Sequence, residues 1–174
     1  MESKAKLLGH PIHPMLIVFP LGLLATAVIF DIVGLSSGNP FWFQVSFWMI
    51  AAGIVGGLLA AIFGVIDWLA IPRNTRAWNV GLWHGAGNVV VVVLFIVSWL
   101  LRRPDPANPT AGALTLSFVA VLLALVTGWL GGELVDRLGV GVEDGANLNA
   151  SNSLLRSPAR TRETEKQSRL DRAA

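Results

Sequence analysis

Three histidines are the residues of this 174-residue sequence that are best suited to chemistry. His10 and His13 lie near the N-terminus, each directly before a proline, and His84 lies four residues before Asn88. Neutral imidazole is the commonest metal ligand in proteins, and two imidazoles on different helices suit the two faces of a b-type haem. The chain has no cysteine, which excludes thiolate ligands, iron–sulfur clusters and disulfides.

Two carboxylates and one amide belong with the histidines. Asp67, Asn88 and Glu133 are polar residues in or beside long apolar stretches, where ionisable groups are costly and mark functional sites by default. His84 and Asn88 share one helix face because they are four residues apart. We therefore expect His10, His13 and His84 to bind a cofactor, with Asp67, Asn88 and Glu133 hydrogen-bonding around them.

Four apolar stretches must position these residues. The composition is 53% apolar and only 14% charged, against roughly a quarter charged in soluble domains, which excludes an ordinary water-soluble globular protein. Since a bilayer crossing takes about 20 helical residues, we predict spans at residues 15–35, 42–71, 80–101 and 111–135. The connecting loops are short, so the fold class is all-α: an antiparallel four-helix transmembrane bundle with a disordered C-terminal tail.

The distribution of Lys and Arg predicts the orientation, because cytoplasmic loops accumulate both residues. One side of the membrane holds Lys4, Lys6, Arg73, Arg76, Arg137 and the basic residues of the tail, and the opposite side holds only Arg102 and Arg103. Both termini are therefore predicted to be cytoplasmic. All six candidate site residues fall at this cytoplasmic end, and Asp31 is a carboxylate at the other end.

The chain divides into a transmembrane domain, residues 1–142, and a polar basic tail, residues 143–174. Within the tail, residues 150–174 are rich in Ser and Arg and have no apolar period, which predicts disorder. Such a basic segment suits an anionic lipid surface or a protein partner. Nucleic-acid binding is not expected, because residues 150–174 contain no aromatic side chain to stack on bases.

The two N-terminal histidines lie in the segment Gly9-His10-Pro11-Ile12-His13-Pro14. A residue before proline favours extended backbone, so we expect both histidines on a stiff, extended segment that leads into the first helix. Pro14 suits the first turn of that helix. Glycines beside His84 and near Glu133 have two interpretations, tight helix packing or room for a flat ligand.

These residues leave several functions open. The first is a single b-type haem near the cytoplasmic face, held by His84 with His13 or His10, acting in electron transfer. The second is a non-catalytic accessory subunit of a larger membrane complex, or a homo-oligomer. A non-haem metal site formed by the three histidines, His13 and His84 above all, with Asp67 or Glu133 is a third. A structural cluster, with Asp67 paired to Arg73 or Arg76 and with Asn88 and His84 hydrogen-bonding across helices, is the fourth. No nucleophile motif occurs, so an enzyme is not the favoured prediction.

The same motifs resemble a bacterial transmembrane family catalogued as domain of unknown function 2231. The resemblance rests on the His10 to Pro14 segment, Asp67, His84 with Asn88, and the stretch from Gly128 through Glu133 to Val135, and it covers roughly residues 7–142. It implies a four-helix, cytochrome-like protein of the bacterial inner membrane. Many relatives carry a further histidine after the final Gly-Gly pair, where this chain has Leu138, so a site that needs that histidine would be incomplete here.

Overall fold

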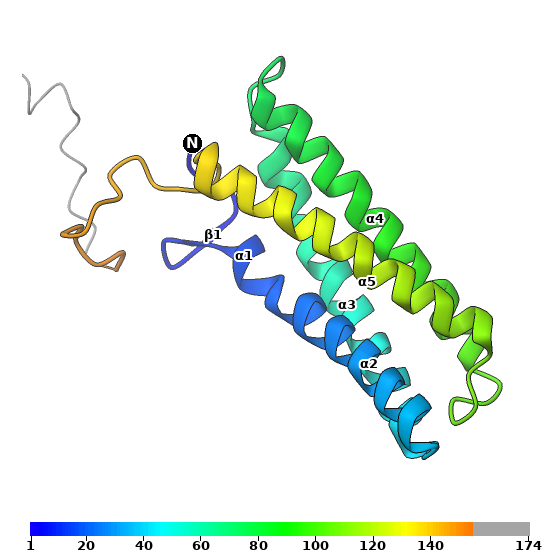
Figure 1. Ribbon diagram of the computed structural model, residues 1–174. Coiled ribbons are helices and arrows are strands. Elements are labelled where there is room, and N and C mark those ends of the chain that lie inside the picture. The colour runs from blue at the N-terminus through cyan, green and yellow to red at the C-terminus, as the bar shows by residue number, and fades with distance from the viewer. Residues whose placement is uncertain (155–174) are drawn as a thin grey trace, which may run out of the picture.

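The computed structural model describes residues 1–154, which form four long helices preceded by a short hairpin (Figure 1). The elements are β1 (Lys6–Leu7), β2 (His10–Pro11), α1 (Ile12–Leu16), α2 (Val18–Ser37), α3 (Phe41–Leu69), α4 (Arg76–Arg102), α5 (Ala111–Gly132) and the π-helical turn η1 (Glu133–Arg137). β1 and β2 pair antiparallel. Most of the tail predicted to be disordered, residues 155–174, lies outside the described residues.

Four helices of the described chain are long and apolar enough to cross a bilayer: Ile12–Ser37, Phe41–Leu69, Arg76–Arg102 and Ala111–Arg137. They contain 26 to 29 residues each, more than the roughly 20 that a crossing requires, so each helix tilts or extends beyond the hydrocarbon. At most 28% of the residues in the apolar window of any span are buried inside the protein. The predicted all-α membrane fold is confirmed, and most of its apolar surface faces outward.

Threonine side chains determine where two of the helices begin. Thr75 Oγ1 accepts a hydrogen bond from the Trp78 amide at 3.1 Å, so α4 starts at Arg76 rather than at the predicted residue 80. Thr110 Oγ1 accepts in the same way from the Ala113 amide at 3.2 Å, and α5 starts at Ala111 as predicted. Both contacts satisfy amide donors that the first turn of a helix leaves without an intrahelical acceptor.

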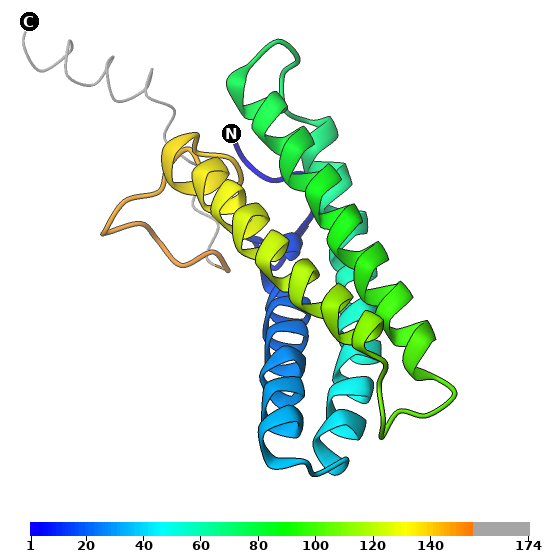
Figure 2. The same ribbon diagram turned by 45° about the vertical axis from the view of Figure 1, so that its right-hand side comes forward.

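The bundle is built from two helical hairpins, α2 with α3 and α4 with α5, that lie side by side (Figures 1 and 2). Their buried positions correspond. Three buried residues of α2 each have a buried equivalent on α4 that lies 71 positions later in the chain. The pairs are Leu24 with Phe95, Ala27 with Ser98, and Asp31 with Arg102. On α3 and α5 the offset is 67 positions. The buried pairs there are Ser46 with Ala113, Ile50 with Ser117, Gly53 with Ala120, and Ala60 with Thr127.

We infer from this correspondence that the two hairpins are structural repeats related by an approximate local twofold axis. In an arrangement with twofold symmetry, a residue at the axis contacts its own equivalent. Asp31 contacts its equivalent Arg102, and His13 lies next to its equivalent His84. Both hairpins run in the same direction, so the axis follows the length of the bundle, with the histidines near one end and the ion pair near the other.

A fully buried ion pair joins the hairpins. Arg102 donates from Nη1 to Asp31 Oδ1 and from Nη2 to Oδ2, both at 2.7 Å, and both side chains are 0% exposed. The guanidinium also donates to three serine hydroxyls, at 3.3, 3.2 and 3.0 Å: those of Ser46, Ser98 and Ser117. These contacts involve α2, α3, α4 and α5, so the pair links all four long helices.

The position of Arg102 changes the charge count that predicted the orientation. The sequence pattern predicts Arg102 and Arg103 in a loop, but Arg102 is the last residue of α4 and its side chain is buried in the bundle. Only Arg103 is exposed there, with its guanidinium 5.4 Å from the centre of the Trp99 ring. The difference in exposed positive charge between the two ends is larger than the sequence suggested.

The ion pair makes single substitutions costly. We expect Arg102→Met to destabilise the bundle by about 3–5 kcal/mol, because it leaves Asp31 buried without a cation. The double variant Asp31→Leu/Arg102→Met removes both charges and should be more stable than Arg102→Met. Unfolding in mixed detergent measures these effects, with Arg103→Met as an exposed control close to wild type. A double variant no more stable than the single variant would contradict this assignment.

Candidate functional site

The structure separates the predicted site residues into groups. His13, His84 and Asn88 come together between the two hairpins, whereas His10, Asp67 and Glu133 each have partners of their own. In the described residues, no three His, Asp or Glu side chains converge as a metal-binding group. The candidate site is therefore built on two imidazoles.

His13 reaches from α1 to the backbone of α3. Its Nδ1 lies 2.8 Å from the carbonyl oxygen of Ala60. The ring lies against Gly64, where an added Cβ would be 2.9 Å from both Nδ1 and Cε1. Ala60 and Gly64 are one helical turn apart, so the missing side chain of Gly64 opens the path by which the imidazole reaches the carbonyl.

His84 makes the equivalent contact in the second hairpin. Its Nδ1 lies 2.8 Å from the carbonyl oxygen of Thr127 on α5. The ring lies against Gly131, one turn further along, where an added Cβ would be 3.0 Å from Cε1. The histidine, the carbonyl and the glycine thus recur in both repeats, with the same division of roles.

The two carbonyls determine the tautomer of both histidines. A carbonyl oxygen only accepts hydrogen bonds, so Nδ1 of His13 and Nδ1 of His84 must each carry the proton. Each Nε2 then holds a lone pair. The ring centroids are 6.4 Å apart and the ring planes meet at 89°. Metal-binding histidines in proteins are oriented in this way, with one ring nitrogen donating to a carbonyl and the other free to coordinate.

Asn88 and Thr127 reinforce the position of His84. Thr127 Oγ1 donates to Asn88 Oδ1 at 3.1 Å, and Asn88 Nδ2 donates to the backbone carbonyl of His84 at 2.9 Å. Asn88 Nδ2 also lies 3.4 Å from His84 Nε2 and 3.5 Å from Nδ1. The amide nitrogen is thus almost equally far from both ring nitrogens, whereas a donor in line with the Nε2 lone pair would be much farther from Nδ1 than from Nε2. The amide therefore lies over the face of the ring and leaves the Nε2 lone pair free.

His13 does not have the extended backbone that its position before Pro14 predicted. His10 is in β2, but His13 is the second residue of α1. Pro14 is the third residue of α1, within the first turn, where a missing N–H removes no helical hydrogen bond. The steric preference of a residue before proline is modest, and the contacts of the imidazole with Ala60 and Gly64 outweigh it.

His10 lies outside the histidine pair. Its backbone is part of the hairpin, its side chain is exposed, and its Nε2 lies 3.2 Å from Ser153 Oγ. The hairpin turn has left-handed backbone at Leu8 and Gly9, with φ of 51° and 86°. An added Cβ on Gly9 would lie 2.9 Å from Ser153 Cβ, so this glycine permits residues after the bundle to pack against the turn.

Asp67 anchors the N-terminal segment. Both of its carboxylate oxygens accept from Ser3 Oγ at 2.8 Å, and Oδ1 accepts from the amides of Lys4 and Ala5 at 2.7 and 3.2 Å. Three donors, the Ser3 hydroxyl shared between the two oxygens and the two amides, tie residues 3–5 across the end of α3. The predicted pairing of Asp67 with Arg73 or Arg76 is wrong: among the described residues no ion pair joins Asp67 to either arginine, and Arg76 pairs with Glu133 instead.

Glu133 pairs with Arg76 of α4, whose Nη2 lies 2.5 Å from Glu133 Oε1. The predicted span 111–135 places Glu133 in the last turn of an α-helix, but Glu133 is the first residue of the π-helical turn η1. Leu138, where the resemblance led us to expect a histidine, follows η1 and donates its amide to the Glu133 carbonyl at 3.2 Å. Neither residue has a hydrogen bond to His13 or His84 among the described residues.

Sequence reasoning overlooked three residues of the site: Ala60, Thr127 and Gly64. A backbone carbonyl has no signature in residue type, so Ala60 and Thr127 were not identifiable as acceptors. The available signal was the repeat itself, since 18 residues separate His13 from Asp31 and the same number separates His84 from Arg102. The glycines are packed against the imidazoles at Gly64 and Gly131, whereas Gly85, Gly128 and Gly132 have nothing within 4 Å.

The glycine contacts give a separable prediction for the two histidines. In histidine ¹⁵N spectra, wild-type protein should show His13 and His84 as Nδ1–H tautomers. Gly64→Ala should shift only the His13 signals and Gly131→Ala only those of His84, because each new Cβ would displace one ring from its carbonyl. Gly85→Ala and Gly128→Ala are matched controls that should leave both unchanged. Equal effects of all four substitutions would contradict the geometry.

A family model described as "Predicted membrane protein (DUF2231)" matches residues 9–144. The matched region includes all three histidines, all four long helices and η1. No curated protein and no solved structure matches the chain. The family match covers well over half of the sequence and confirms the resemblance seen in its motifs. The chain therefore belongs to the predicted membrane protein family DUF2231.

Proposed function

We propose that this protein binds one b-type haem between His13 and His84 and transfers electrons within the membrane. The observation that supports the proposal is the symmetric pair of imidazoles. Each is fixed through Nδ1 to a carbonyl of the neighbouring helix, and the two lie 6.4 Å apart at the local twofold axis. His10, which is exposed and bonded to Ser153, is not a ligand in this proposal.

The separation of the rings fits a single shared metal ion. A metal lies about 2 Å from an imidazole nitrogen, so two ring centroids on opposite sides of one ion are about 6 Å apart. His13 and His84 would hold the ion from the two hairpins. The free lone pair of His13 Nε2, which has no hydrogen-bond partner among residues 1–154, is available for this role.

The number of ligands favours haem over a non-haem metal. A zinc or non-haem iron site takes three or four protein ligands, whereas a haem supplies four nitrogens of its own and would need only two residues of the chain to hold its iron. The described residues supply two imidazoles and no third converging His, Asp or Glu. Haem bound here would supply one-electron chemistry to a protein that has no cysteine or tyrosine of its own.

The chain's own residues would control that chemistry in two ways. The carbonyls of Ala60 and Thr127 accept the Nδ1 protons, which keeps both rings neutral and makes each Nε2 a stronger electron donor. The Asn88 and Thr127 hydrogen bonds restrict rotation of His84. A histidine pair at one end of the bundle supports electron exchange near one face of the membrane, and the excess of exposed Lys and Arg favours the cytoplasmic face.

Absorption spectra of the purified protein test the proposal. From cells with ample haem, wild-type protein in detergent should show a Soret band that sharpens on reduction with dithionite. His13→Ala and His84→Ala should each abolish the low-spin spectrum, and His10→Ala should leave it unchanged. Since a variant can also fail by misfolding, His84→Gly should regain the spectrum when free imidazole is added. A colourless wild type, or a band that survives in His84→Ala, would overturn the proposal.

A further inference from the structure

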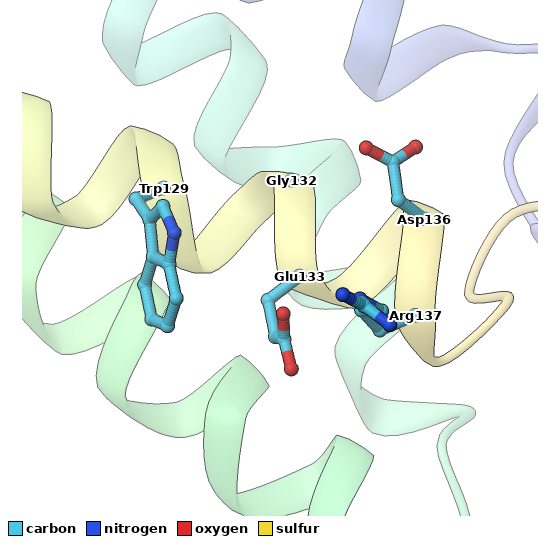
Figure 3. A pocket seen from close by; sticks show the side chains of 5 residues that line it. All are labelled: Trp129, Gly132, Glu133, Asp136 and Arg137. Carbon is cyan, nitrogen blue, oxygen red and sulfur yellow. The ribbon is translucent and has the colours of Figure 1, made fainter.

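A hollow of about 310 Å³ opens on the surface where α5 continues into η1. Trp129, Gly132, Glu133, Asp136 and Arg137 line it. In Figure 3, Trp129 and Glu133 point to one side of the helix, Arg137 projects beside Glu133, and Asp136 lies across the ribbon from them. Gly132 has nothing within 4 Å of where its Cβ would be, so the absence of a side chain there leaves the hollow open.

The hollow lies at the end of an apolar strip on the outer face of α5. Leu122, Leu125 and Trp129 follow one another at helical spacing, and all three are at least 63% exposed. Trp129 leads directly to the charged residues of η1. From Leu122 to Arg137, the surface therefore changes from aliphatic to aromatic to charged, in the order in which a phospholipid changes from acyl chain to headgroup.

The charges in the hollow have both signs. Arg76 engages Glu133 Oε1, and within residues 1–154 no ion pair or side-chain hydrogen bond involves Glu133 Oε2, Asp136 or Arg137. Two carboxylates and one guanidinium therefore border the hollow, Glu133 and Arg137 on one side and Asp136 across from them. This combination is complementary to a headgroup that carries both a phosphate and a hydrogen-bonding ammonium group.

Comparison of the two repeats shows that packing does not require these charges. The residues of α3 that are equivalent to Trp129, Gly132, Glu133 and Asp136 are 67 positions earlier: Ile62, Val65, Ile66 and Leu69. All four are exposed and apolar, as expected for a helix face in contact with lipid tails. The fold accommodates a plain apolar surface at this position in the first hairpin, so the polar hollow is specific to the second.

We propose that the hollow is a binding site for a phospholipid with a phosphoethanolamine headgroup. Arg137 binds the phosphate, Asp136 and the free oxygen of Glu133 accept hydrogen bonds from the ammonium group, and the acyl chains follow Leu122 and Leu125. A phosphatidylglycerol headgroup has no ammonium group for the carboxylates to bind. Phosphatidylcholine carries a quaternary ammonium that has no N–H to donate. The site thus distinguishes headgroups by their hydrogen-bond donors, and it is independent of the proposed haem.

Native mass spectrometry of the full-length protein in detergent tests this site. The probes are phosphatidylethanolamine, phosphatidylglycerol and phosphatidylcholine with identical acyl chains, added in equal amounts. We expect wild-type protein to retain phosphatidylethanolamine preferentially, and Asp136→Asn and Arg137→Gln each to reduce this retention about fivefold. Asp105→Asn and Arg73→Gln make the same chemical changes in loops outside the hollow and should retain wild-type binding.

Two further measurements keep the outcome unambiguous. Soluble phosphoethanolamine, added in equal amount, should not displace the lipid, because it makes no contact along α5. Displacement by phosphoethanolamine would show a headgroup site without lipid specificity and would contradict the proposal. Thermal unfolding of each variant confirms that the bundle is intact. Equal retention of the three lipids by wild-type protein, or wild-type retention by a folded Asp136→Asn variant, would overturn the proposal.

Discussion

Within hydrocarbon a charged side chain is tolerated only next to an opposite charge and with its hydrogen bonds satisfied, and the Asp31–Arg102 pair meets both conditions. Three serines complete the shell of acceptors around the guanidinium. Because the five residues come from all four long helices, the pair restricts how each helix can slide or rotate. The alignment that it imposes at one end of the bundle is continued by the same helices to the other end, where the histidines lie.

Main-chain carbonyls, not charges, position the side chains at that other end. Each imidazole crosses to the next helix of its own hairpin and binds a carbonyl one turn before a glycine. A helix backbone is rigid and its carbonyls are evenly spaced, so this contact defines both the tautomer and the direction of the free lone pair. The contact occurs once in each repeat, and the local symmetry brings the two rings together.

The departures from the repeat are as informative as the repeat. Asp31 and Arg102 are equivalent positions with opposite charges, a difference that allows them to pair across the axis. The outer face at η1 carries charges where the equivalent face of α3 is apolar. The first repeat alone has an N-terminal segment, tied to Asp67 and stabilised by Lys6, whose hydrogen bond lowers the pKa of the Glu2 carboxyl. Each departure introduces a polar interaction that symmetry does not require.

Hydrophobicity is additive along a chain, so the sequence alone determined the number of spans, their approximate limits and the clustering of polar residues at one end. The same reasoning placed His84 near His13 or His10, because short loops bring alternate helix ends together, and only the structure selects His13. The tertiary structure alone decided that Arg102 turns inward, that Asp67 holds the N-terminal segment and that Arg76 pairs with Glu133. These partners lie 57 to 71 residues apart, and their choice depends on helix rotation, which a pattern of residue types does not specify.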